Sequence, residues 1–76
     1  MAGKGLVEYW FRNEKKLLVL KDKKMYEVAK EIGLDLHYLS NILNRNMPIK
    51  HKAMAYAISK YAGPNFEIDD LFDKKM

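Results

Sequence analysis

The sequence predicts an all-α fold of five helices, and three observations support that prediction. Apolar residues in Met25–Asn44 recur at three- and four-residue spacings, which gives two consecutive segments one apolar stripe each. Between these segments, Gly33 stands where a helix ends in a left-handed residue, and Asp35 stands where an N-cap begins the next helix. A later apolar segment stops at Gly63-Pro64. With 76 residues, 49% of them hydrophobic, the chain suits one domain (residues 1–76) with one core.

The N-terminal part permits two interpretations. Residues 1–5 include Gly-Lys-Gly, which predicts a flexible start. As a helix, the next segment places four large apolar residues near one face: Leu6, Trp10, Leu17 and Leu20. As strands, Leu6–Phe11 and Leu17–Leu20 are rich in residues that favour β structure, and polar residues between them would form the turn. A polar linker follows, with Asp22 as a candidate cap for the second helix.

The remaining helices follow from spacing and stop signals. The second and third helices occupy Met25–Asn44, and the small side chain of Ala29 allows their axes to approach closely. Pro48 disfavours helix at the residue before it, so a loop is expected there. The fourth helix is Lys50–Ala62, with this apolar face: Ala53, Met54, Ala57, Ile58 and Tyr61. A short fifth helix, Glu67–Phe72, closes the core through its last two residues.

The charges are segregated along the chain. The formal net charge is +4, and no acidic residue occurs between Leu36 and Phe66. That interval holds only basic ionisable groups besides tyrosine: His37, Arg45, Lys50, His51, Lys52 and Lys60. Four acidic residues gather directly after it, at Glu67, Asp69, Asp70 and Asp73. A positive surface around the third helix is what a partner rich in phosphate groups requires.

The chain lacks the patterns of the main catalytic and metal-binding classes. It has no cysteine, which excludes disulfides and thiolate metal sites. His37 and His51 lie on different elements with no acidic residue between them, which is not the spacing of a zinc site. No Gly-rich phosphate loop or nucleophile motif occurs, so we expect no enzyme activity, metal or cofactor. No secretory signal or membrane-spanning run is seen, and a cytoplasmic location is expected.

Five positions of the central segment match a known pattern in residue type and spacing: Ala29, Gly33, Leu34, Leu39 and Ile42. Through them, Met25–Asn44 resembles the helix-turn-helix of the Cro/repressor (lambda-repressor-like) family of phage and bacterial transcription regulators. The resemblance covers about Leu17 to Phe72 and favours a first helix over Asn13–Lys21. Met25 stands where that family usually has a phosphate-contacting glutamine, and we expect it in the core.

The third helix supplies the candidate base contacts. His37, Ser40 and Asn41 share its polar face, and Leu36 borders that face near the N-terminus. In helix-turn-helix geometry the second motif helix enters the major groove with its N-terminal residues leading. Asparagine pairs with adenine, histidine donates to guanine, serine fits either base, and leucine meets a thymine methyl group. The face also lacks the Glu and Lys residues that solvated helix faces usually carry.

The resemblance further implies phosphate contacts at the start of the second helix and around the loop after the third. In that loop, Asn44-Arg45-Asn46 replaces the Glu-x-Gly that is common in the family. Tyr38 is equally suited to the core and to a phosphate contact. The phosphate-contact candidates are Lys24, Tyr26, Tyr38, Asn44, Arg45, Asn46, Lys50, His51 and Lys52.

The expected function is sequence-specific binding of double-stranded DNA by a small transcription regulator, nucleoid-associated in a bacterium or in the host cytoplasm if encoded by a phage. The resemblance implies a homodimer. Its interface is expected either around Phe66, Ile68 and Phe72 or at the aromatic run Tyr9–Phe11. Two alternatives stay open: a protein-interaction module, such as an antitoxin or anti-regulator, and a weakly specific DNA-architecture or excision factor.

Overall fold

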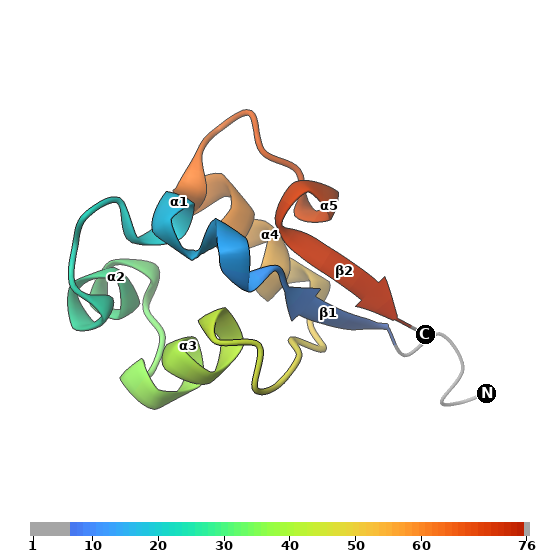
Figure 1. The fold of residues 1–76 in the computed structure, drawn as a ribbon, viewed down its shortest axis with the longest axis horizontal. Coiled ribbons are helices and arrows are strands. Elements are labelled where there is room, and N and C mark those ends of the chain that lie inside the picture. Colours follow the sequence, from blue (N-terminus) through green and yellow to red (C-terminus); the bar gives the residue numbers. More distant parts are fainter. Residues whose placement is uncertain (1–6, 76) are drawn as a thin grey trace.

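Helices and a small terminal sheet make up the described part of the chain, residues 7–75 of a computed structural model (Figure 1). The elements in order are β1 (Glu8–Phe11), a 3₁₀ helix (Asn13–Lys15), α1 (Lys16–Leu20), α2 (Met25–Ile32), α3 (Leu36–Leu43), α4 (Lys52–Ala62), α5 (Ile68–Leu71) and β2 (Phe72–Lys75). The prediction of an all-α fold is therefore wrong, although five α-helices are present among these residues. The expected flexibility of residues 1–5 lies outside the described residues.

The sheet pairs the two ends of the described chain. Strands β1 and β2 are antiparallel (Figure 1), and their register places Phe11 opposite Phe72. Both rings are buried and meet edge to face, with centroids 5.3 Å apart. Tyr9 also exchanges two backbone hydrogen bonds with Ile49, each of 2.8 Å, which ties the α3–α4 loop to the other edge of β1. The strand alternative was thus correct at Glu8–Phe11.

The fifth helix ends one residue earlier than predicted, because the C-terminal strand begins at Phe72. The expected helix Glu67–Phe72 is shorter, Ile68–Leu71, and Phe72 leaves it with extended backbone angles. The buried pairing of Phe72 with Phe11 explains the change, because a residue 61 positions away supplies the strand's partner. Local sequence gives no sign of this strand, since Phe72–Lys75 has one apolar residue.

The first helix is short and packs on the core through Val19 and Leu20. The expected segment Asn13–Lys21 forms as the 3₁₀ helix followed by α1, and Lys21 ends α1 in a left-handed conformation. Val19 is fully buried, whereas Leu17 is 75% exposed, so the expected apolar face that included Leu17 is wrong. Trp10 lies in β1, so the four apolar residues predicted to share one helix face do not belong to one helix.

Helices α2 and α3 form the predicted helix-turn-helix. Gly33 ends α2 with φ of 89°, and Asp35 begins α3 with its side chain accepting from two backbone N–H groups. Ala29 is buried, as its small side chain predicts for a site of close helix approach. The candidate cap Asp22 is wrong, because the N-cap of α2 is Lys24. Glu27 replaces it by accepting from the Lys24 backbone N–H at 2.9 Å.

Helix α4 begins two residues later than predicted, and its core-facing side matches the prediction only in part, through Met54, Ile58 and Tyr61. Ala55, Ile58 and Ser59 are fully buried, whereas Ala53 and Ala57 are exposed. Because alanines lie on several sides of α4, its sequence does not clearly distinguish an apolar face from a polar one. The buried Ser59 hydroxyl donates to the Ala55 carbonyl at 2.9 Å, so a polar side chain is accommodated in the core.

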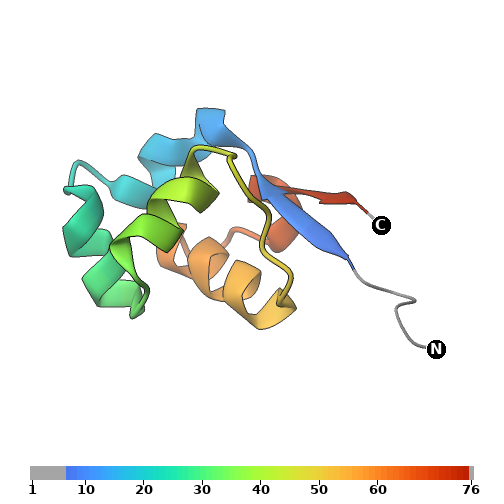
Figure 2. The same ribbon diagram turned by 90° about the horizontal axis from the view of Figure 1, so that it is seen from below.

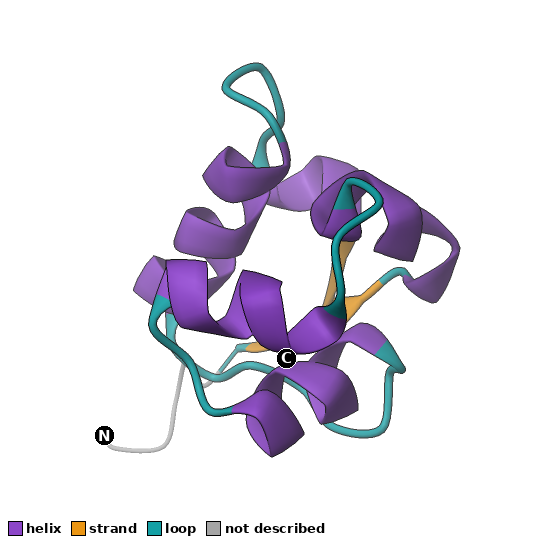
Figure 3. Ribbon diagram, turned by 90° about the vertical axis from the view of Figure 1, so that its left-hand side faces the viewer, coloured by secondary structure: helices purple, strands orange, loops and turns teal. Residues whose placement is uncertain are grey.

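The core lies where the helices and the sheet converge (Figure 2). From the helix-turn-helix end of the molecule, the helices face the viewer and the strands lie behind them (Figure 3). The sheet therefore stands beside the C-terminal end of α3, and the N-terminal end of α3 points away from the sheet (Figures 1 and 2). Among the helices of residues 7–75, none combines the length and apolar composition needed to cross a membrane.

Candidate nucleic-acid interface

The exposed face of α3 begins at a well-formed N-cap. The Asp35 carboxylate accepts hydrogen bonds from the backbone N–H groups of His37, at 3.0 Å, and Tyr38, at 3.3 Å. Beyond this cap, Leu36 is 41% exposed and the His37 side chain is 93% exposed. The N-terminal turn of α3 therefore projects into solvent on a fixed backbone.

Burial of the opposite side of α3 sets the rotation of the helix. Leu39, Ile42 and Leu43 are fully buried in the core. Asn41 is exposed and Ser40 is half-buried, so the structure brings all four candidate base contacts to the outward side: Leu36, His37, Ser40 and Asn41. Tyr38 is half-buried and packs against the core. Its role as a phosphate contact stays a prediction.

A short polar network follows along the same side of α3. Asn46 donates from its side-chain amide to the Asn41 side-chain oxygen at 3.5 Å, and from its backbone N–H to the Asn41 carbonyl at 2.8 Å. Asn44 donates to the Ser40 hydroxyl at 3.3 Å. These contacts orient neutral groups that both donate and accept, which is the chemistry that base edges require.

The start of α2 offers a second polar surface. Lys24 and Tyr26 are exposed there, and Met25 packs against the core as expected. The Glu27 carboxylate already binds the Lys24 backbone N–H, so a phosphate group that approached this N–H would compete with an anion of the chain itself. The Lys24 ammonium is the cation that favours a phosphate at this end.

Helix α2 is braced against α4 by a hydrogen-bonded cluster. The Glu31 carboxylate accepts from the Tyr61 hydroxyl and from the Lys23 ammonium, the latter at 2.9 Å. These bonds lower the pKa of Glu31, with Tyr61 as the largest cause, and the bond to Glu31 raises the pKa of Tyr61. The cluster joins three segments and holds α2 in place relative to the rest of the domain.

Arg45, a predicted phosphate contact, turns toward the sheet, and its role as a phosphate contact stays a prediction. It follows α3 with φ of 61°, and its Nη1 donates to the Phe11 carbonyl and to Asp73 Oδ2, both at 3.0 Å. Its guanidinium carbon lies 5.9 Å from the centroid of the Trp10 ring. Asp73 Oδ1 also accepts from Arg12 Nε at 3.0 Å. Hydrogen bonding to Arg45, and the charges of both arginines, lower the pKa of Asp73.

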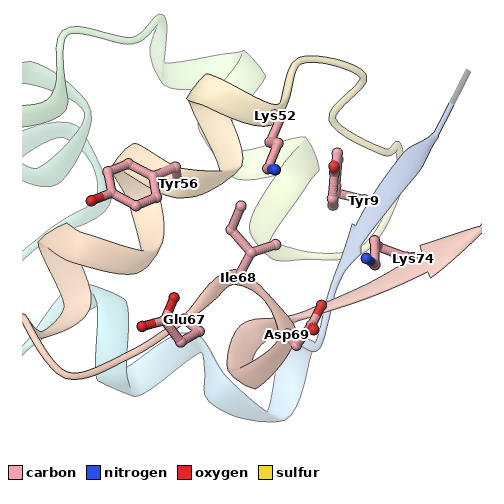
Figure 4. A pocket seen from close by; sticks show the side chains of 7 residues that line it. All are labelled: Tyr9, Lys52, Tyr56, Glu67, Ile68, Asp69 and Lys74. Atoms are coloured by element: carbon pink, nitrogen blue, oxygen red, sulfur yellow. The ribbon is translucent and has the colours of Figure 1, made fainter.

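The other loop candidates divide between two sides of the molecule. Asn44 and Asn46 are exposed beside α3, and Lys50 and His51 are exposed before α4. Lys52 differs, because it lines a pocket of about 330 Å³ formed by α4, α5 and both strands, with no residue of α2 or α3 in its walls (Figure 4). Lys52 thus also lines a surface to which α2 and α3 do not contribute, and its role as a phosphate contact stays a prediction.

The residues predicted for the dimer interface differ in their solvent exposure. Phe72 is 1% exposed and Phe11 is fully buried, so both serve the core of the single chain and offer no surface to a partner. Phe66 and Ile68 are half-buried. Gly63 contacts the Phe66 ring so closely that a Cβ there would lie 2.9 Å from Cδ2. Of the predicted interface residues, Phe66, Ile68 and Trp10 remain partly accessible.

Sequence reasoning missed three residues near the C-terminal end of α3. They are Arg12, Lys16 and Asp73, and Lys16 Nζ donates to the Asn44 side-chain oxygen at 2.7 Å. The sequence gives little indication of them, since these contacts join residues at least 28 positions apart. Within residues 7–75, no three metal-ligating side chains gather. No family model, curated protein or solved structure matches the chain.

Proposed function

We propose that this protein is a sequence-specific double-stranded DNA-binding transcription regulator, similar to the Cro/repressor family. One observation carries the proposal above the others. Helix α3 presents neutral donors and acceptors on an exposed N-terminal face, while its opposite face is fixed by three fully buried aliphatic residues. A helix held in this way suits insertion into the major groove, where base edges are read by such groups.

The surrounding charges support a mechanism in which phosphates position the domain and α3 reads the bases. Lys24 lies at the start of α2 and Lys50 lies in the α3–α4 loop, so a lysine is present at each end of the helix-turn-helix. The protein would act in the cytoplasm of its cell by occupying an operator, and it would block or recruit polymerase there. Binding of two half-sites one helical turn apart requires a two-fold dimer with its two copies of α3 about 34 Å apart, and Phe66 and Ile68 are candidates for its interface.

The decisive experiment is selection of bound duplexes from a random DNA pool at near-physiological salt, followed by sequencing. Enrichment of a palindrome is the expected result, and its half-site spacing would report the dimer geometry. Enrichment of a single half-site would support base reading by a monomer. A parallel titration from low to high salt should show the steep loss of affinity that phosphate contacts produce.

Two results of the same experiment would replace this proposal. Retention of DNA without an enriched motif would favour a DNA-architecture or excision factor. No retention even at low salt would exclude DNA as the partner and would favour a protein-interaction module.

A further inference from the structure

Two arginines share one carboxylate at the junction of the sheet and α3. Asp73 Oδ1 accepts from Arg12 Nε and Asp73 Oδ2 accepts from Arg45 Nη1, both at 3.0 Å. Arg12 follows β1, Asp73 lies in β2, and Arg45 follows α3, so the three residues tie three segments together. Each carboxylate oxygen is occupied by a different guanidinium group, which fixes the relative orientation of the two arginines.

The arginines keep donors that these bonds do not use. A guanidinium group has five N–H donors, and the bonds above engage Nε of Arg12 and Nη1 of Arg45. The two side chains are 38% and 33% exposed, so neither is enclosed by the protein. A planar guanidinium group with free N–H donors matches the geometry of a phosphate better than a lysine ammonium does.

The local charge also favours an anion. Arg12, Arg45 and Lys16 bring three positive charges to this region, and Asp73 removes one. The C-terminal end of a helix carries about half a negative charge, which opposes an anion, and the remaining positive charges outweigh it. Lys16 reaches Asn44, the residue directly after α3, so the positive charge lies close to the recognition helix.

We propose that Arg12 and Arg45, oriented by Asp73, form a binding site for one backbone phosphate of DNA beside the C-terminal end of α3. The proposal rests on the DNA-binding function proposed above. It makes Arg12 a phosphate contact that lies outside the helix-turn-helix, and it makes Asp73 a positioning residue. The C-terminal strand thereby becomes part of the DNA-binding surface, because Asp73 belongs to β2.

Charge and orientation predict opposite results when Asp73 is neutralised. Asp73→Asn removes a negative charge, so long-range electrostatics alone would tighten DNA binding. Loss of the shared carboxylate instead frees both guanidinium groups, so the phosphate must order them on binding. We expect Asp73→Asn to weaken binding to the selected duplex roughly fivefold to tenfold, measured by fluorescence anisotropy.

Glu8→Gln is the matched control. Glu8 lies on β1 of the same sheet, it carries the same charge, and it contacts the Trp10 indole instead of an arginine. We expect this variant to bind with unchanged or slightly higher affinity. Tighter binding by both variants would show that Asp73 acts only as a repulsive charge and would overturn its positioning role.

Two substitutions of Arg12 test the phosphate site directly. Arg12→Lys keeps the charge and loses the planar group, so affinity should fall severalfold while the salt dependence stays the same. Arg12→Ala should also lower the slope of log affinity against log salt by about one. A slope and an affinity equal to those of the wild type in Arg12→Ala would overturn the phosphate site.

These outcomes separate the site from the proposed function. If the wild-type protein retains no DNA, both proposals fail. If it selects a motif that Asn41→Ala alters, while the Arg12 variants bind like the wild type, only the phosphate site fails. Thermal unfolding followed by circular dichroism checks each fold, and the Arg12 variants decide the question if Asp73→Asn does not fold.

Discussion

The carboxamide of Asn41 lies on the exposed side of α3, and its oxygen already accepts a hydrogen bond from Asn46. A carboxamide at this position can donate to N7 of adenine and accept from its N6 amino group. Asn41→Ala should therefore weaken binding to the selected duplex by about 1–3 kcal/mol and relax the preference at one base pair. Selection with the variant protein checks this result, and an unchanged motif would remove Asn41 from the base contacts.

The ionisation of Asp73 makes the stability of the fold depend on pH. The hydrogen bond from Arg45 lowers the pKa of Asp73 below its ordinary value of about 3.9. The folded state thus binds the proton more weakly than the unfolded state, and the carboxylate contributes stability above the ordinary pKa. That contribution is lost as the pH falls through the lower, folded-state pKa.

Denaturant titrations of the wild type and Asp73→Asn across pH 2–7 would measure this effect. The difference between their free energies of unfolding should be constant above about pH 5 and should shrink below about pH 4. A difference that stays constant down to the lowest pH would contradict a lowered pKa. Glu8→Gln, in the same sheet, serves as the comparison.

Residues whose role depends on close neighbours in sequence were predictable. Asp35 and Gly33 act through backbone groups a few positions away, so their types and spacing indicated a cap and a stop. Arg45 was predicted as a phosphate contact from its position beside the third helix. Its partners are Phe11 and Asp73, at separations of 34 and 28 residues, and no local pattern reports such contacts.

At the scale of the element, the turn between α2 and α3 depends on one backbone conformation. Gly33 adopts φ of 89°, and a Cβ placed there would meet no heavy atom within 4 Å. Gly33→Ala should therefore lower the free energy of unfolding by about 1 kcal/mol or somewhat more through backbone strain alone. Denaturant unfolding measures the loss, and Gly33→Asn should lose less because asparagine tolerates this conformation. Equal stability of the alanine variant would contradict this explanation.

Elements were predictable where their apolar spacing was regular and ambiguous where it was not. Met25–Asn44 has well-separated stripes, and both of its helices formed as predicted. Helix α4 has alanines on several sides, so the predicted face included the exposed Ala53 and Ala57. Strand β2 follows α5 without a turn signal, and only its pairing with β1 makes it a strand.

At the scale of the whole molecule, the two aromatic rings of the sheet join the chain ends to the helical core. Phe72 is 1% exposed and contacts Phe11 edge to face. Phe72→Ala should cost about 3–5 kcal/mol, a large share of the roughly 5–15 kcal/mol that stabilises a typical domain. Denaturant unfolding tests this cost.

The half-buried Phe66 provides the contrast. Phe66→Ala should cost less stability, and sedimentation should show a weaker dimer if Phe66 lies in the dimer interface. A small cost for Phe72→Ala together with a lost dimer would show that Phe72 faces a partner.

The pairing of β1 with β2 also governs how fast the native state forms. Phe11 and Phe72 lie at opposite ends of the described chain, with all five α-helices between them. The helices need only contacts between near neighbours, whereas the sheet must close a loop that spans most of the chain. Such long-range contacts slow folding relative to a helical bundle of the same size. The helices should gain protection from amide hydrogen exchange before the sheet does during refolding, and the guanidinium pair beside α3 should reach its native arrangement last.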